Sequence, residues 1–216
     1  MKLPIYFKNI HQCAALFAKS YSIKPTTGFA LIELIIVVII ILALMAVVIP
    51  SFQENKLQFT LSKVAYQFAQ DVRRAQDKAL SSAQYVDSNG DQKTIAGYGI
   101  YVDIDVLGDK KYILYADNAN ENPGNKAYDE LDYIIETIDL NVTEPDVLIK
   151  QIDNASANKV SINFNISNLN TTISELTESQ NSVSFIFALL SDLNKTKTVL
   201  VNSAGLVQVQ WDGEKV

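Results

Sequence analysis

The chain has 216 residues, of which 48% are hydrophobic and 19% are charged, and this composition excludes a disordered or collagen-like chain. The charge is distributed unevenly along it. Residues 1–28 contain four lysines and no acidic residue, whereas all 24 acidic side chains follow later, together with the other 14 basic ones. The resulting net charge of −10 after residue 28 disfavours DNA as a partner, because binding to phosphates needs clustered lysine and arginine.

The cysteine and histidine content limits the possible chemistry. Cys13 and His11 are the only residues of their types, so an intramolecular disulfide and a Cys/His zinc site are excluded, and a Ser-His-Asp or Cys-His enzyme nearly so. Lipidation of Cys13 is disfavoured because Ile10, His11 and Gln12 are not the small apolar residues that precede such a cysteine in lipoproteins. We therefore predict no enzymatic activity, no cofactor and no metal site.

Residues 29–49 form an apolar run of 21 residues that contains one charge, Glu33. As a helix this run would be roughly 31 Å long, which matches the hydrocarbon thickness of a bilayer. A lipid-facing strand could not satisfy its own backbone, so a helix is favoured despite the many isoleucines and valines. The preceding lysines predict a single membrane span with the N-terminus in the cytoplasm and the C-terminal part outside.

Two features distinguish this run from a secretory signal peptide and from a simple anchor. It is too long for a signal peptide and no small-x-small cleavage site ends it; instead Gly28 precedes it, and Pro25-Thr26-Thr27 should keep that glycine extended and accessible. Glu33 is the second feature, since a carboxylate inside a membrane costs on the order of 2.5–3.5 kcal/mol. We interpret Glu33 as pairing with a cation from another chain; the alternative is that it snorkels or is protonated near the cytoplasmic end.

Residues 24–34, Lys-Pro-Thr-Thr-Gly-Phe-Ala-Leu-Ile-Glu-Leu, closely resemble the class III signal of type IV prepilins and type II secretion pseudopilins. In that family prepilin peptidase cuts after the glycine and methylates the new N-terminal phenylalanine, and the glutamate neutralises the N-terminal amine of a neighbouring subunit. The resemblance implies prepilin peptidase cleavage between Gly28 and Phe29, N-methylation of Phe29, and a role for Glu33 in filament assembly. Pro50 matches the helix-kinking proline that is frequent in pilins.

After Pro50, which should kink the helix or begin a new segment, apolar residues recur at spacings of three and four. This apolar stripe consists of Leu57, Leu61, Val64, Phe68, Val72, Ala75 and Ala79. Charged residues occupy the other faces, and we interpret Arg73 and Arg74 as part of a solvated face rather than a phosphate-binding patch. The pattern predicts an amphipathic helix over residues 51–83.

Residues 84–216 contain short segments of alternating polarity separated by turns, which predict an extracytoplasmic β-rich domain. The eight expected strands are 97–105, 111–116, 133–138, 147–152, 160–166, 183–190, 198–201 and 206–211. Residues 202–205, Asn-Ser-Ala-Gly, predict that the last two strands form a hairpin. The expected fold is therefore α+β and pilin-like, with a basic leader peptide (1–28), a transmembrane helix (29–50) and an amphipathic helix (51–83) packed on an antiparallel β-sheet domain (84–216).

The β-rich domain is similar to that of the GspH/FimT-like pseudopilins in the order of its features, at residues 71–80, 97–101 and 199–207. The resemblance implies a minor pseudopilin. Asp87, Asn89 and Asp91 offer oxygen atoms at alternate positions, as calcium loops do, but they lack the glycine and distal glutamate of an EF-hand; we interpret them as a turn, with calcium binding as the alternative. Residues 117–130 are expected to be a solvated loop, with partner binding as the alternative.

The resemblance thus implies a structural subunit, a minor pilin or pseudopilin, of a type IV pilus or type II secretion-like filament. It also implies a single-pass protein of the cytoplasmic (inner) membrane that then enters an extracellular or periplasmic filament. The resemblance implies prepilin peptidase, other pilin or pseudopilin subunits, an inner-membrane assembly platform and membrane lipid as partners. One alternative is a single-span membrane-anchored β-domain binding protein that is not polymerised. Another is a membrane-anchored hydrolase, for which the pairs Asp103/Asp105 and Asp129/Asp132 would need to face each other across a cleft.

Overall fold

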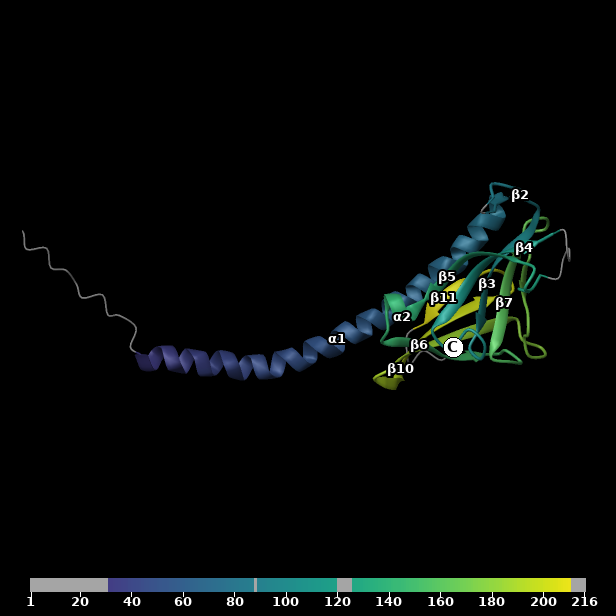
Figure 1. The fold of residues 1–216 in the computed structure, drawn as a ribbon. Helices are drawn as coiled ribbons and strands as arrows, with labels where there is room; N and C mark the ends of the chain where they lie inside the picture. Colours follow the sequence, from purple (N-terminus) through teal and green to yellow (C-terminus); the bar gives the residue numbers. More distant parts are fainter. Residues whose placement is uncertain (1–30, 88, 120–125, 211–216) are drawn as a thin grey trace, which may run out of the picture. The chain divides into compact units, whose positions relative to one another are not determined.

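The computed structural model describes residues 31–87, 89–119 and 126–210, apart from the side chains of Pro50 and Ser51. Over these ranges the chain forms a long helix, α1 (Leu31–Leu80), a short helix, α2 (Leu140–Thr143), and eleven strands. The chain divides into two compact units, residues 1–48 and residues 49–216. The second unit contains all the strands (Figure 1).

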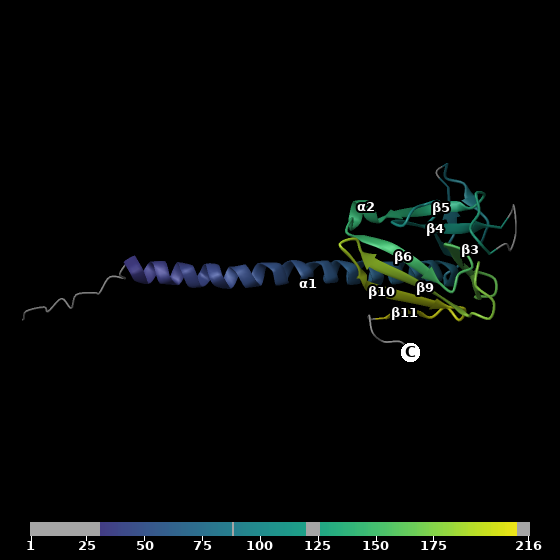
Figure 2. The same cartoon turned by 90° about the horizontal axis from the view of Figure 1, so that it is seen from below.

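Two antiparallel sheets form the body of the second unit, and Figure 2 shows their main strands as two layers. The five-stranded sheet has, in spatial order, β5 (Tyr133–Asp139), β4 (Lys111–Asn118), β3 (Ile95–Asp103), β7 (Lys159–Asn165) and β8 (Thr171–Ile173). The four-stranded sheet has β11 (Val207–Gln210), β10 (Asp192–Asn202), β9 (Ser182–Leu189) and β6 (Val147–Asp153). A separate pair consists of β1 (Tyr85–Val86) and β2 (Gln92–Lys93).

The apolar stripe of α1 enters the core between the two sheets, as predicted from its helical spacing. All its members from Leu61 to Ala79 are buried. Phe68 shows the arrangement best, because its ring centroid lies 5.0 Å from that of Tyr112 on β4 and 4.7 Å from that of Phe185 on β9. Aromatic contacts at these distances add to the stabilisation that comes from removing apolar surface from water.

Two arginines join α1 to the edge strands of the two sheets. Arg74 Nη2 lies 2.5 Å from Oε2 of Glu136 on β5, and Arg73 Nη2 donates a 3.0 Å hydrogen bond to the carbonyl oxygen of Val207 on β11. Both arginines remain partly accessible to solvent, in keeping with the predicted solvated face, but they also bind the sheets. Asp71 was expected on the solvated faces with the other charged residues of this helix, but it is only 9% exposed and faces β4.

All eight predicted strands are present, and the predicted terminal hairpin is confirmed by the antiparallel pairing of β10 and β11. Its turn places Gly205 at φ +80°, a conformation that favours glycine. The structure adds β1, β2, β8 and α2, and it begins β10 at Asp192 rather than at residue 198. Helix α1 continues through Pro50, and the kink expected at this residue stays a prediction.

Candidate functional site: the exposed apolar surface of α1

The predicted processing residues, Gly28 and Phe29, lie outside the described residues. Glu33 lies in the first turn of α1 and is exposed, and Pro50 lies within α1. Cleavage, methylation and the assembly role of Glu33 therefore stay predictions. What the structure does describe is the surface on which Glu33 lies.

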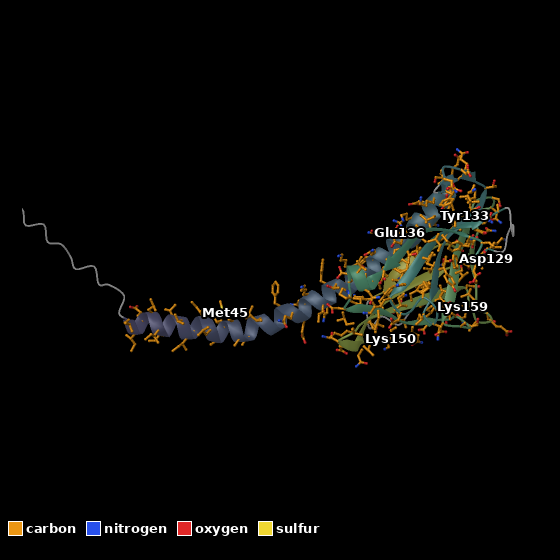
Figure 3. The ribbon with its side chains drawn as sticks, in the orientation of Figure 1. Met45, Asp129, Tyr133, Glu136, Lys150 and Lys159 are labelled. Atoms are coloured by element: carbon orange, nitrogen blue, oxygen red, sulfur yellow. The ribbon has the colours of Figure 1, made fainter. Side chains whose placement is uncertain are left out.

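Residues 31–49 of α1 are exposed on every face of the helix. The least exposed large side chains, such as Ile35 and Ile41, still have 45% of their surface accessible, and Leu31 has 77%. Figure 3 shows Met45 in this segment, with its neighbours pointing away from the helix axis in several directions. Full burial of one such side chain is worth about 1.5–3 kcal/mol, so this surface strongly favours an apolar environment.

This is the one helix among the described residues that is long and apolar enough to cross a membrane. Within it, Glu33 is the sole charged residue between Leu31 and Ile49, and none of the ion pairs among the described residues involves it. An unpaired carboxylate on a lipid-facing helix is costly, which is why such residues usually have a partner. The described part of α1 therefore combines an exposed apolar surface with a single carboxylate.

A second exposed surface, which sequence reasoning missed, continues along α1 within the second unit. Phe52, Phe59 and Tyr66 are 73%, 72% and 46% exposed, and their spacing of seven residues places them on one side of the helix. Phe59 precedes the buried Phe68 by nine residues, which at about 100° per residue places the two rings on opposite sides. We call these three residues the aromatic stripe; its heptad spacing is visible in the sequence.

The possible calcium loop has the geometry of a turn. Asp87 Oδ1 accepts hydrogen bonds of 2.9 Å from the backbone N–H groups of Asn89 and Asp91. The Lys93 ammonium lies 2.9 Å from Asp87 Oδ2 and 3.6 Å from Asp91 Oδ2, and its hydrogen bond lowers the pKa of Asp87. The Lys93 ammonium thus lies beside the Asp87 and Asp91 carboxylates, where a bound calcium ion would have to lie.

The two carboxylate pairs considered for a hydrolase serve local structure. Asp103 Oδ1 accepts a 3.0 Å hydrogen bond from the backbone N–H of Asp105. Asp132 Oδ2 accepts a 3.0 Å hydrogen bond from the backbone N–H of Asp129, and its Oδ1 accepts one of 2.8 Å from that of Asn118. Within the described ranges, no group of three or more His, Cys, Asp or Glu side chains is arranged to hold a metal ion.

No protein-family model, curated protein or solved structure matches this chain significantly. The architecture itself is nevertheless specific: a 50-residue N-terminal helix, apolar in its first part, packed through its second part on antiparallel sheets. This arrangement is pilin-like.

Proposed function

We propose that the chain is a structural subunit, a minor pilin or pseudopilin, of a type IV pilus or type II secretion-like filament. The observation that carries this proposal is the contrast within α1. Its first part is apolar and exposed on all faces, whereas the stripe from Leu61 to Ala79 is buried between two sheets. Such a helix suits a protein that is first held in a membrane and then packed among the helices of identical or related chains.

The residues before and within α1 add the chemistry of assembly. Prepilin peptidase would cut after Gly28 and methylate the amine of Phe29, and the inner-membrane platform would receive the processed subunit. Inside the filament, Glu33 would pair with the amine of a neighbouring Phe29. A charge that loses such a partner in a low-dielectric interior is left uncompensated, so the pair favours correct docking of each new subunit.

The decisive experiment is to determine the mature N-terminus. The full chain is expressed with a prepilin peptidase, recovered from membranes, and analysed by mass spectrometry. We expect a chain that begins with N-methylated Phe29. As a matched control, Gly28→Val places a branched side chain at the cleavage site and should leave the leader attached. An intact leader on the unsubstituted chain would contradict the proposal and favour the alternative, a membrane-anchored β-domain binding protein that is not polymerised.

A further inference from the structure

The five-stranded sheet has a polar layer on the face that points away from α1. Two glycines of β3 make room for it. A Cβ atom on Gly97 would lie 2.5 Å from Oδ1 of Asn163, and a Cβ atom on Gly99 would lie 2.5 Å from the ring of Tyr115. Because β3 has no side chains there, Tyr115 from β4 and Asn163 from β7 both lie over it and are fully buried.

Asp117 lies in this layer at the end of β4, and it is only 1% exposed. Its Oδ2 accepts a 3.1 Å hydrogen bond from Asn163 Nδ2, whereas its Oδ1 has no hydrogen-bond partner among the described residues. None of the ion pairs that the structure describes supplies a lysine or arginine for it. A buried carboxylate oxygen without a donor is costly when the group is ionised.

Residues 126–132, which we call the covering segment, lie against this layer. The backbone N–H of Tyr128 donates a 3.1 Å hydrogen bond to Ser161 Oγ, and the Tyr128 ring stacks on that of Tyr101 with centroids 4.5 Å apart. Asp132 binds the backbone N–H of Asn118 on β4. The covering segment thus contacts β3, β4 and β7 of the five-stranded sheet.

A continuous chain of hydrogen bonds connects Asp117 with the covering segment. Asn163 Nδ2, which binds Asp117, also donates a 3.3 Å hydrogen bond to the Tyr115 hydroxyl group. That hydroxyl group lies 2.6 Å from Ser161 Oγ, which accepts from Tyr128 N–H. The chain thus links the carboxylate of Asp117 to the hydroxyl group that accepts the backbone hydrogen bond of the covering segment.

We propose that Asp117 is a proton-binding site that controls the covering segment: protonated Asp117 keeps residues 126–132 on the sheet, and ionised Asp117 loosens them. The titratable groups that act on Asp117 are Asp132 and Asp129 of the covering segment, both acidic, so ionisation places a buried charge beside like charges. The neutral acid has no such repulsion, and it leaves no charged oxygen buried without a donor.

Burial, and after it the charge of Asp132, raises the pKa of Asp117 to about 6, although the hydrogen bond from Asn163 acts in the opposite direction. Burial also raises the pKa of Asp132 and those of Tyr115 and Tyr128, so the tyrosines stay neutral. When the covering segment is released, Asp117 should return towards an ordinary pKa of about 3.9. Because the closed form then binds more protons, closure is favoured below about pH 6 and is weakened as the pH rises through that value.

Hydrogen–deuterium exchange of the full chain in detergent micelles tests this inference. Exchange is followed by mass spectrometry in peptides that contain residues 126–132, at about pH 5 and about pH 7.5, after correction for the intrinsic pH dependence of exchange. Linkage between the two pKa values predicts that the protection of the covering segment is about tenfold lower at the higher pH. Peptides from β9 and β10 serve as the internal reference and should keep their protection.

Asp117→Asn imitates the protonated acid, because it is neutral and similar in shape. In this variant the protection of the covering segment should be high at both pH values. Asp146→Asn is the matched control, since Asp146 is exposed, and it should keep the tenfold change of the unsubstituted chain. Equal protection of the unsubstituted chain at both pH values would overturn the proposal, as would an unchanged pH response in Asp117→Asn. If Asp117→Asn lost protection in β9 and β10 as well, the substitution would have destabilised the whole second unit. The comparison of the unsubstituted chain at the two pH values would then test the proposal alone.

Discussion

The hydroxyl group of Tyr112 donates a 2.7 Å hydrogen bond to Oδ2 of Asp71, and this buried contact joins β4 to α1. Asp71 is the one acidic side chain of α1 that is buried among the described residues. Burial raises its pKa, whereas the hydrogen bond from Tyr112 and the charge of Arg74 act in the opposite direction. The pair thus links the helix to the sheet through one carboxylate oxygen, while Oδ1 of Asp71 lies 3.6 Å from Arg74 Nη2 on the same helix.

Tyr112→Phe should destabilise the second unit by about 1–3 kcal/mol, since it removes the donor to Oδ2 of Asp71 and leaves that buried oxygen unsatisfied. The measurement is the denaturant-induced unfolding of the full chain in detergent micelles. Tyr66→Phe is the control, because Tyr66 is exposed on the same helix, and it should change the free energy of unfolding by less than about 0.5 kcal/mol. Equal stability of Tyr112→Phe and the unsubstituted chain would show that the hydrogen bond contributes nothing.

Glu33→Ala should leave membrane insertion and cleavage after Gly28 intact but block or slow incorporation into filaments. Removal of one partner leaves the other charge uncompensated in an apolar interior, a loss of roughly 3–5 kcal/mol. Glu33→Asp should be intermediate, because the charge is retained on a shorter side chain. Processing is followed on a gel, and incorporation is quantified in sheared filaments. Normal incorporation of the alanine variant would contradict the proposed pairing.

Phe59 and Phe68, on opposite sides of α1, should respond differently to substitution. Phe68→Ala removes a fully buried ring and should destabilise the second unit by about 3–5 kcal/mol. Phe59→Ala removes a ring that is 72% exposed, so the stability should change by less than about 0.5 kcal/mol.

In the filament assay, Phe59→Ala should nevertheless lower incorporation, since the aromatic stripe extends the apolar surface on which the proposed assembly depends. Lys56→Ala is a suitable control, because it removes an exposed and non-aromatic side chain from a neighbouring position of the same helix. Unimpaired incorporation of Phe59→Ala would exclude the Phe59 ring from the assembly surface.

Gly99→Ala should destabilise the five-stranded sheet by about 1–3 kcal/mol through overpacking. Its Cβ atom would lie 2.4 Å from the carbonyl oxygen of Ile162 and 2.5 Å from the Tyr115 ring. Gly90→Asn is the control: no atom lies within 4 Å of its Cβ position, and asparagine tolerates the positive φ of that residue. The midpoints of thermal unfolding of both variants provide the comparison; a Gly99→Ala midpoint equal to that of the control would contradict the close packing over β3.

The main elements of the fold were predictable because their patterns are strong and local. The stripe from Leu57 to Ala79 repeats at helical spacing over six intervals, and each of the eight expected strands alternates or is continuously apolar. The elements that were missed are short or polar. Strand β8 has three residues and α2 has four, and the first part of β10, Asp192-Leu-Asn-Lys, contains no alternation. Strand β8 and the first part of β10 depend on pairing with neighbouring strands, and α2 depends on capping by Asp139; the apolar pattern of the sequence records neither.

The burial of Asp71 and Asp117 could not be predicted for a related reason. Asp117 lies on the outer face of its sheet, and Asp71 lies at the edge of the apolar stripe, about 60° around the helix from Phe68, so the pattern alone assigns neither to the core. Asp71 is buried because Tyr112 supplies a donor from another element, and Asp117 is buried because residues 126–132 cover the outer face of the sheet. The residues around Gly28 and Glu33 present the opposite case: the sequence motif predicts their roles, and the structure describes the apolar helix surface on which Glu33 lies.

The two arginine contacts of α1 also determine how the β-rich unit would bear mechanical load. Arg74 binds β5 in one sheet and Arg73 binds β11 in the other, so a tensile force carried along the helix reaches both sheets at once. For the helix to slide out, the packing of its buried apolar stripe and both arginine contacts would have to break together rather than one by one. A pulling force on the helix would therefore be divided between the two sheets of the second unit instead of acting on one edge strand.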